Sequence, residues 1–291
     1  MSVDLHIHSH CSDGTDSPAE IVRLAKGRGL IHIAITDHDC AEGVPEALAA
    51  GLAQGVRVTS GIEVSVRHDG VPVHVLGYGF TLDHPEMAVF MATLQKERKE
   101  RNQAILAKLA ECRLTVSLDD VRREAGIGQI GRPHFAKTLV KKGYAPSHDE
   151  AFRQYLGRGA KAYAPRPVHS AEEAITMIHK AGGLASLAHP ANIDPSLQKI
   201  SALVAELTAL GLDGLEAHYP THTKAIRAKL LEIAKENQLI ATGGSDYHGA
   251  IRPEAKLAGS RRFRVPTEVS RALLASLAAA SRRSEADLAA K

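Results

Sequence analysis

The 291-residue sequence contains no tryptophan, and aromatic residues make up only 4% of it. Proteins that hold single-stranded nucleic acid without sequence preference stack its bases on aromatic side chains, so this scarcity argues against a broad base-stacking surface. The net charge of +3 is compatible with an anionic substrate. It is too small for a protein that coats duplex DNA.

Cysteine and long apolar runs are also scarce. Cys11, Cys40 and Cys112 form no paired framework and no CxxC motif, which argues against structural disulfides. No apolar run approaches the roughly 20 residues that a membrane-spanning helix needs. The first residues, MSVDLHIH, lack the basic start and apolar core of a secretory signal. We therefore expect a cytoplasmic protein without a membrane partner.

The sequence repeats one form, a short apolar or β-branched run that ends at polar residues. Examples are VDLHIHSH, IHIAITDHD, VPVHVLGYGF, GLASLAHP and LIATGGSDYHG. Helical patterns such as SPAEIVRLAKGRG lie between many of them. This alternation predicts an α/β fold of parallel strands with crossover helices. In a barrel the strand ends meet at one mouth, whereas an open doubly wound sheet brings only two or three together.

Residues 83–167 interrupt this alternation. The segment is mostly helical in pattern and rich in charge, and it includes the run KERKER. Such a run is more typical of a solvated helix face than of a binding patch. The segment predicts a helical insertion that contributes substrate-binding residues, and residues 1–82 and 168–291 then form the metal-binding barrel.

Histidines and carboxylates gather in these strand segments. His6 and His8 are two residues apart and therefore point to the same face of a strand. The other members, in chain order, are Asp13, His38, Glu63, His74, His189, Asp246 and His248. A single buried histidine is usually a satisfied core residue, but nine such groups each need a partner to offset desolvation. Metal ions satisfy them together, and imidazole with carboxylate donors suits zinc, iron or manganese.

The ordered motifs H-x-H, T-D-H-D, G-x-E, a lone strand histidine, A-H-P and S-D-x-H resemble those of the PHP (polymerase and histidinol phosphatase) superfamily. The resemblance covers essentially the whole chain. It implies a distorted (β/α)7 barrel with a multinuclear metal centre at its mouth. The stretch GRPHFA within a helical insertion is similar to the branch of 3′,5′-nucleoside bisphosphate phosphatases and 5′-to-3′ oligonucleotide exonucleases.

The resemblance also implies how the ligands divide among ions. His6, His8, Glu63 and Asp246 are implied for the first ion, Glu63, His74 and His189 for the second, and Asp13, His38 and His248 for the third. Many family members carry a histidine where Asp13 stands. The harder oxygen donor favours manganese, with zinc and iron as alternatives, and we expect two or three ions per chain. Asp37 is expected to orient a ligand, and the roles of Glu216 and His218 stay open.

A centre of this kind suits the hydrolysis of a phosphate ester, because cations activate water and neutralise the oxygens of the group attacked. His189 and His248 are both candidates for protonating the leaving group. Arg132 and His134 in GRPHFA are candidates to bind a second phosphate, Arg132 through a bidentate fork. Arg158 and Lys161 in GRGAKAY either add to this binding or are plain surface charge.

Two separate anion sites select a substrate with two phosphates. We therefore expect removal of the 3′-phosphate from nucleoside 3′,5′-bisphosphates, such as pAp to AMP, with nucleotide release from the 5′ end of short RNA or DNA as a related activity. A histidinol-phosphate phosphatase is the nearest alternative and needs no second anion site. Alternatives of other classes are a non-catalytic metal-binding accessory domain and a general nucleic-acid binder, which would show a steep salt dependence.

Overall fold

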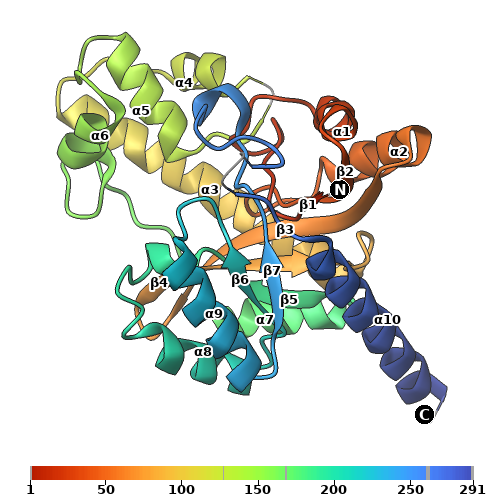
Figure 1. The fold of residues 1–291 in the computed structure, drawn as a ribbon. Coiled ribbons are helices and arrows are strands. Elements are labelled where there is room, and N and C mark those ends of the chain that lie inside the picture. Colours follow the sequence, from red (N-terminus) through yellow and green to blue (C-terminus); the bar gives the residue numbers. More distant parts are fainter. Residues whose placement is uncertain (1, 127, 168, 260–262, 290–291) are drawn as a thin grey trace.

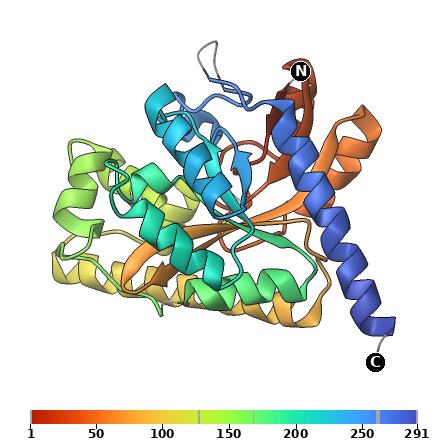
Figure 2. The same ribbon diagram turned by 60° about the horizontal axis from the view of Figure 1, so that its bottom comes forward.

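The computed structural model describes residues 2–126, 128–167, 169–259 and 263–289. In this part of the chain seven strands form one sheet in sequence order: β1 Ser2–Asp4, β2 Leu30–Ile35, β3 Arg57–His68, β4 Val71–Tyr78, β5 Leu184–Leu187, β6 Gly214–His218 and β7 Ile240–Gly243. The segments that follow β1 and β7 then join the two edges. The backbone N–H of Leu5 donates to Gly243 O (3.1 Å), and that of His8 donates to Tyr247 O (2.8 Å). The sheet is thus closed into a barrel (Figures 1 and 2).

The barrel is distorted because β4 runs against its neighbours. β4 pairs antiparallel with both β3 and β5, while the other strand pairs in the sheet are parallel. The expectation of parallel strands throughout is therefore wrong at this point. Asp69 and Gly70 join β3 to β4 with φ angles of 45° and 77°. A two-residue turn of this kind can only make a hairpin, whereas parallel pairing needs a longer crossover.

Helices cover the outside of the barrel (Figure 2). They are α1 Pro18–Gly27, α2 Val44–Gln54, α7 Ala171–Lys180, α8 Ile200–Ala209, α9 Lys224–Glu236 and α10 Thr267–Ala289, with short 3-10 turns η2 Pro190–Asn192 and η3 Gly249–Ile251. The start of α1 follows from its sequence, since Ser17 accepts a hydrogen bond from Glu20 N (3.1 Å) and Pro18 occupies the first turn. The largest apolar cluster lies between β3–β6 and α7–α9 and includes Val64, Val75, Ile178, Leu187 and Leu215.

The helical insertion predicted between β4 and β5 is present (Figure 1). It contains α3 Pro85–Glu111, α4 Leu118–Ala125, α5 Arg132–Lys141, α6 His148–Ala151 and the π-helix η1 Phe152–Leu156. Its own apolar cluster includes Leu109, Phe135 and Leu139. The first half of α3, however, buries Met87 and Phe90 in the cluster of the barrel. The division at residues 83 and 167 stays a prediction.

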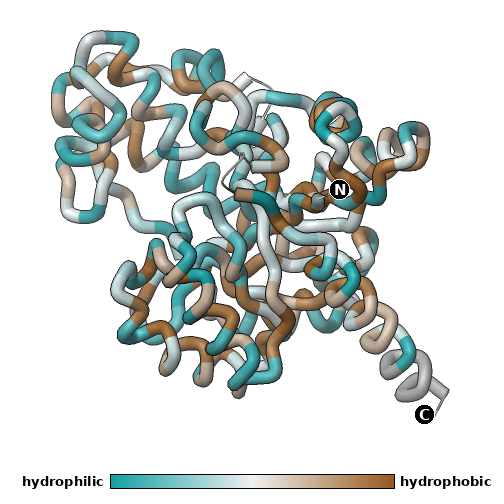
Figure 3. Tube along the Cα trace, viewed as in Figure 1, coloured by the Kyte–Doolittle hydropathy of each residue, from teal (hydrophilic) through white to brown (hydrophobic). Residues whose placement is uncertain are grey.

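The distribution of hydropathy follows this arrangement. Apolar stretches lie on the strands and the adjoining helix turns, and the middle of α3 is hydrophilic (Figure 3). Among the described residues no helix is both long enough and apolar enough to cross a membrane. The polar side chains that remain buried are concentrated at the mouth of the barrel, where the strands end.

Candidate metal centre

Four of the predicted ligands meet where Glu63, in the middle of β3, faces His6 and His8 after β1 and Asp246 after β7. Glu63 Oε2 lies 3.0 Å from Nε2 of His8 and 3.2 Å from Nε2 of His6. Asp246 Oδ1 lies 3.3 Å and 3.5 Å from the same two nitrogen atoms. All four side chains are buried. His6 and His8 are two residues apart on an extended segment, and their imidazoles face the same point, as the spacing predicted.

Glu63 joins this group to a second one. Its other oxygen, Oε1, lies 2.7 Å from Nδ1 of His74 and 3.0 Å from Nε2 of His189. His38 approaches from the end of β2, with Nδ1 3.3 Å from Glu63 Oε2. A carboxylate that faces histidines through both oxygen atoms has the arrangement of a ligand shared between ions.

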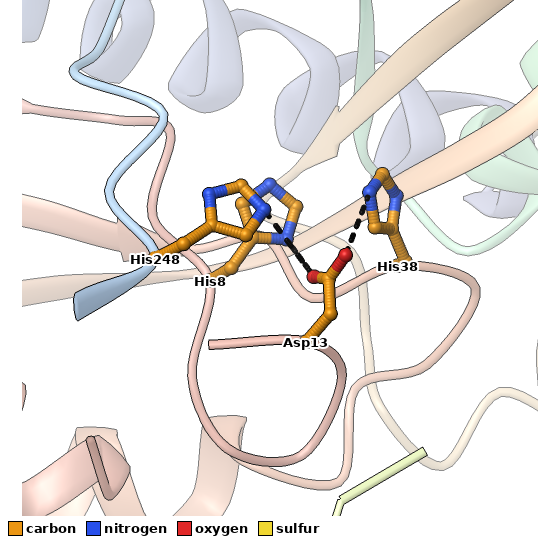
Figure 4. Close-up of side chains that lie close together, drawn as sticks. All are labelled: His8, Asp13, His38 and His248. Carbon is orange, nitrogen blue, oxygen red and sulfur yellow. Dashed lines mark ion pairs between the residues drawn. The ribbon is translucent and has the colours of Figure 1, made fainter. Parts of the chain in front are cut away.

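The remaining predicted ligands form a third group, which contains Asp13, His38 and His248 and also His8 (Figure 4). Asp13 Oδ1 lies 3.3 Å from Nε2 of His248, and Asp13 Oδ2 lies 3.9 Å from Nε2 of His38. The rings of His8 and His248 stack with their centroids 4.1 Å apart. Eight of the nine predicted ligands thus fall into three overlapping groups that share His8, His38 and Glu63, and the ninth, His189, joins them through its contact with Glu63.

The donor atoms of this cluster fit divalent cations. Within the described residues, His38 Nδ1, His189 Nδ1 and His248 Nε2 are buried without a hydrogen-bond partner. Burial alone would raise the pKa of Glu63, but the positive charges of the surrounding histidines hold it well below its usual range. An ionised carboxylate among unpaired imidazole nitrogens is a donor set for zinc, iron or manganese.

Thiolate ligation is not supported. Burial raises the pKa of Cys11 to about 11 and raises that of Cys40 well above its usual value. In the described part of the chain, neither thiol belongs to a group of candidate ligand atoms.

Several residues hold the ligands in place. Glu216 Oε1 lies 3.0 Å from Nδ1 of His6, and Glu216 Oε2 accepts the backbone N–H of His189 (2.7 Å). Tyr219 donates its hydroxyl to Oδ2 of Asp246 (2.8 Å). Asp37 accepts from Ser9 N (2.7 Å) and from Ser12 Oγ (2.5 Å), which orders the turn that carries Asp13. Contacts of this kind fix the orientation of metal ligands and the tautomer of histidines.

Four arginines gather beside the centre: Arg98, Arg101, Arg132 and Arg166, called here the arginine cluster. Asp39, which follows His38, accepts hydrogen bonds from Arg98 and from Arg166 Nη1 (2.8 Å). Burial and the positive charges of its three arginine neighbours lower the pKa of Arg101 to about 9. In the described part of the chain Arg101 Nε is buried and has no hydrogen-bond partner. The arginine cluster therefore carries more positive charge than Asp39 offsets.

The interpretation of KERKER as a solvated face is wrong for its two arginines. Lys96 and Lys99 are exposed, but Arg98 and Arg101 turn toward the barrel. Leu94, Arg98, Arg101 and Ile105 recur at helical spacing on one face of α3, and Leu94 and Ile105 are buried. This periodicity was the available signal, because residues three and four apart on a helix share a face.

The predicted substrate residues have different surroundings. Arg132 starts α5 and belongs to the arginine cluster, and its guanidinium lies 5.9 Å from the ring centroid of Phe152. His134 is buried, Gly131 N donates to its Nδ1 (3.0 Å), and burial lowers its pKa to about 4. His134 is therefore neutral at pH 7 and adds no charge for a phosphate. Arg158 and Lys161 are exposed, with Lys161 Nζ 6.0 Å from the ring of Tyr155, and the roles proposed for them stay predictions.

Comparison with known protein families identifies the architecture. The family model of the PHP domain matches residues 4–158. The chain belongs to the PHP domain family. A solved structure from Bifidobacterium adolescentis, described as a candidate metal-dependent phosphoesterase, superposes with a TM-score of 0.83 at 30% identity and covers 94% of this chain and 95% of its own. The prediction of an α/β fold with a distorted PHP-type barrel is confirmed.

Curated relatives are similar over most of the chain. A 5′-3′ exoribonuclease of Haemophilus influenzae is 34% identical over 84% of this chain and 89% of its own length, and a 3′,5′-nucleoside bisphosphate phosphatase of Chromobacterium violaceum is 34% identical over 85% and 87%. A phosphoribosyl 1,2-cyclic phosphate 1,2-diphosphodiesterase of Eggerthella lenta is 32% identical over 86% and 95%. These findings confirm the prediction of a phosphate-ester hydrolase. None of these three names refers to histidinol phosphate, so that alternative is not favoured.

Proposed function

We propose that this protein removes the 3′-phosphate from nucleoside 3′,5′-bisphosphates, converting pAp to AMP. The observation that carries the proposal is the arginine cluster beside a cluster of nine candidate metal ligands. One anion site for the scissile phosphate and another for a second phosphate match a substrate with a phosphate at each end of one nucleoside. The bisphosphate phosphatase of Chromobacterium violaceum, similar over 85% of this chain, supports the same substrate.

In this proposal the strand-end cluster holds two or three divalent ions, with manganese the expected metal because Asp13 supplies a hard oxygen donor. His6, His8, Glu63 and Asp246 hold one ion, Glu63, His74 and His189 a second, and Asp13, His38 and His248, with His8 beside them, a third. Bound ions of this kind supply an activated water and neutralise the oxygens of the phosphate attacked.

Other residues orient the ligands, bind the 5′-phosphate and supply a proton. Glu216 and Tyr219 orient His6 and Asp246, and thereby keep the donor atoms aimed at one point. Arg101 and Arg132 bind the 5′-phosphate, since Asp39 already engages Arg98 and Arg166. Of the two candidates to give a proton to the leaving 3′ oxygen, His189 fits better, because its Nδ1 is buried without a hydrogen-bond partner in the described chain, whereas the partnerless Nε2 of His248 faces Asp13 and is needed for an ion.

A second candidate activity is nucleotide release from the 5′ end of short oligonucleotides. The Haemophilus influenzae relative is named as a 5′-3′ exoribonuclease, and a 3′-phosphodiester carries the same phosphorus at the same place as a 3′-phosphate. We expect the protein to act in the cytoplasm.

The proposal is tested with two substrates that differ by one phosphate. Purified protein with Mn²⁺ is given pAp or 3′-AMP, and products are separated by chromatography. We expect AMP and inorganic phosphate from pAp, with kcat/KM at least about tenfold above that for 3′-AMP, because a hydrogen bond to a charged group contributes that much. Arg132→Ala removes this preference, whereas Lys99→Ala, an exposed lysine on the same insertion, retains it. No AMP from pAp contradicts the proposal.

A further inference from the structure

We propose that Arg252 forms a subsite for the downstream strand of an oligonucleotide, so that the centre cleaves internucleotide phosphodiesters and not terminal phosphates alone. The inference rests on the proposed function, because it assumes that a 5′-phosphorylated nucleotide is bound at the arginine cluster. Arg252 is expected to matter for oligonucleotides and not for nucleoside bisphosphates.

The position of Arg252 is set by Asp246. Oδ1 of Asp246 faces the ring nitrogens of His6 and His8, whereas Oδ2 accepts hydrogen bonds from Tyr219 and from Arg252 Nη1 (2.7 Å). The guanidinium of Arg252 therefore lies on the outer side of Asp246, away from the ligand cluster. Its side chain is 46% exposed, and its bond to Asp246 is the one hydrogen bond that the described residues provide. Among the described residues, the other guanidinium N–H groups of Arg252 have no hydrogen-bond acceptor.

The segment that carries Arg252 is anchored. Ala250 N donates to Oγ1 of Thr15 (2.9 Å), and the hydroxyl of Tyr247 lies against the carboxylate of Asp16. At Gly249 an added Cβ would lie 1.9 Å from Thr15 Oγ1, so the backbone of the segment rests directly on the turn after Asp13. Arg252 therefore lies on a segment that is held against the turn after Asp13.

The order of segments around the barrel indicates which way a bound strand runs from the arginine cluster. The segment that carries His6 and His8 is flanked on one side by β2, after which Asp39 holds the arginine cluster. On its other side the chain pairs with the segment after β7, through the parallel bridge of Ile7 with Tyr247, and this segment leads to Arg252. A strand whose 5′-phosphate is bound at the arginine cluster and whose next phosphorus lies at the centre therefore continues toward Arg252. The next phosphate along the strand is the anion that Arg252 meets.

The reaction balances without a further reactant. Water adds to the phosphorus of the first internucleotide phosphate, and the bond from that phosphorus to the 3′ oxygen of the first nucleotide breaks. The 3′ oxygen takes a proton and leaves as a nucleoside 5′-monophosphate, and the shortened strand keeps the phosphate at its 5′ end. That product has the 5′-phosphate that the next cycle needs at the arginine cluster. In pAp no downstream strand exists, so Arg252 has no such partner.

The test compares pAp with the 5′-phosphorylated trinucleotide pApApA for the wild type, for Arg252→Gln and for Lys256→Gln. Glutamine keeps a donor for Asp246 but removes the charge. Lys256 is an exposed cation on the same segment and makes no hydrogen bond or ion pair with the described residues of the centre. For Arg252→Gln we expect kcat/KM to fall about tenfold or more with pApApA and at most about threefold with pAp, because one charge-assisted contact is lost only with the longer substrate. Lys256→Gln should leave the ratio of the two rates unchanged. Titration calorimetry with Mn²⁺ should give the same affinity for Arg252→Gln as for the wild type.

Three outcomes overturn the inference while the proposed function stands. They are a wild type that hydrolyses pAp but leaves pApApA intact, an equal fall on both substrates in Arg252→Gln, and a loss of the Mn²⁺ affinity that accounts for the fall. The proposed function itself fails in a different way, when the wild type releases no AMP from pAp.

Discussion

Glu216 Oε1 lies 3.0 Å from Nδ1 of His6, and both side chains are fully buried. The contact leaves Nε2 of His6 aimed at Glu63 and Asp246, where a metal ligand is needed. Replacing Glu216 by glutamine keeps the shape of the side chain but removes its charge. We expect Glu216→Gln to weaken Mn²⁺ binding about tenfold, a usual effect for residues that orient a ligand. Titration calorimetry measures this, and an unchanged affinity would show that Glu216 does not act on the centre.

The central carboxylate should have a larger effect than any single histidine. Glu63 faces His74 and His189 with one oxygen and His8 with the other. Glu63→Gln therefore removes a ligand from more than one ion, whereas His74→Ala removes a ligand from one. We expect elemental analysis to find less Mn per chain in Glu63→Gln than in His74→Ala, with hydrolysis of pAp abolished in the former. Equal metal content in the two variants would contradict a shared ligand.

The sequence pointed to the side chains that gather in this cluster but to few of the residues around them. The nine candidate ligands could be singled out because strand patterns and the motifs of the family mark them locally in the sequence. The orienting contacts of Glu216 and Tyr219 were not predictable, because their partners lie far away in the sequence, and the role of Glu216 in LDGLEAHYP was left open. The hairpin of β3 and β4 was signalled by Asp69 and Gly70 but was masked by the parallel pattern around it.

The arginine cluster illustrates the same limit. Arg98, Arg101, Arg132 and Arg166 come from α3, from the start of α5 and from the segment before α7, and only the packing of the insertion on the barrel brings them together. A solvated face was the reasonable interpretation of KERKER, because the sequence does not reveal that Arg98 donates a hydrogen bond to Asp39.

Excess positive charge in the arginine cluster should cost stability when no anion is bound. The pKa of Arg101 is lowered to about 9 by burial and by its arginine neighbours, so its charged form is disfavoured in the folded protein. We expect Arg101→Met to raise the free energy of unfolding by about 1 kcal/mol, as is common when a site built for function is relieved of strain. The same variant should raise the KM for pAp about tenfold, because it loses a charged contact.

Two measurements check this trade-off, namely denaturant unfolding without added anions and steady-state kinetics. Lys99→Met is the matched control, since Lys99 is exposed on the same helix, and it should change neither quantity. Lower stability in Arg101→Met together with an unchanged KM would contradict the assignment of Arg101 to an anion site.

A buried histidine away from the centre should make stability depend on pH. His32 in β2 lies 2.7 Å from both Ser270 Oγ and Thr59 Oγ1, and burial lowers its pKa from 6.5 to about 4. The imidazole of His32 is therefore protonated below about pH 6.5 in the unfolded chain but only below about pH 4 in the folded chain. The stabilising contribution of neutral His32 is present above pH 6.5 and is lost as the pH falls through this window, by about 2 kcal/mol at pH 5.

His32→Gln removes this contribution to the pH dependence. Denaturant unfolding at pH 7 and pH 5 should show a decrease for the wild type that is larger by about 2 kcal/mol than for the variant. Parallel decreases in the two proteins would mean that His32 is not the group responsible.

The central claim is that distant strand ends gather their nitrogen and oxygen donors around divalent cations. Crystals grown with Mn²⁺ and measured for anomalous scattering at the manganese edge test it most directly. We predict two or three manganese peaks around Glu63, within bonding distance of His6, His8, His74, His189, Asp246 and the group of Asp13, His38 and His248. An anomalous map without a peak at Glu63 would contradict the account.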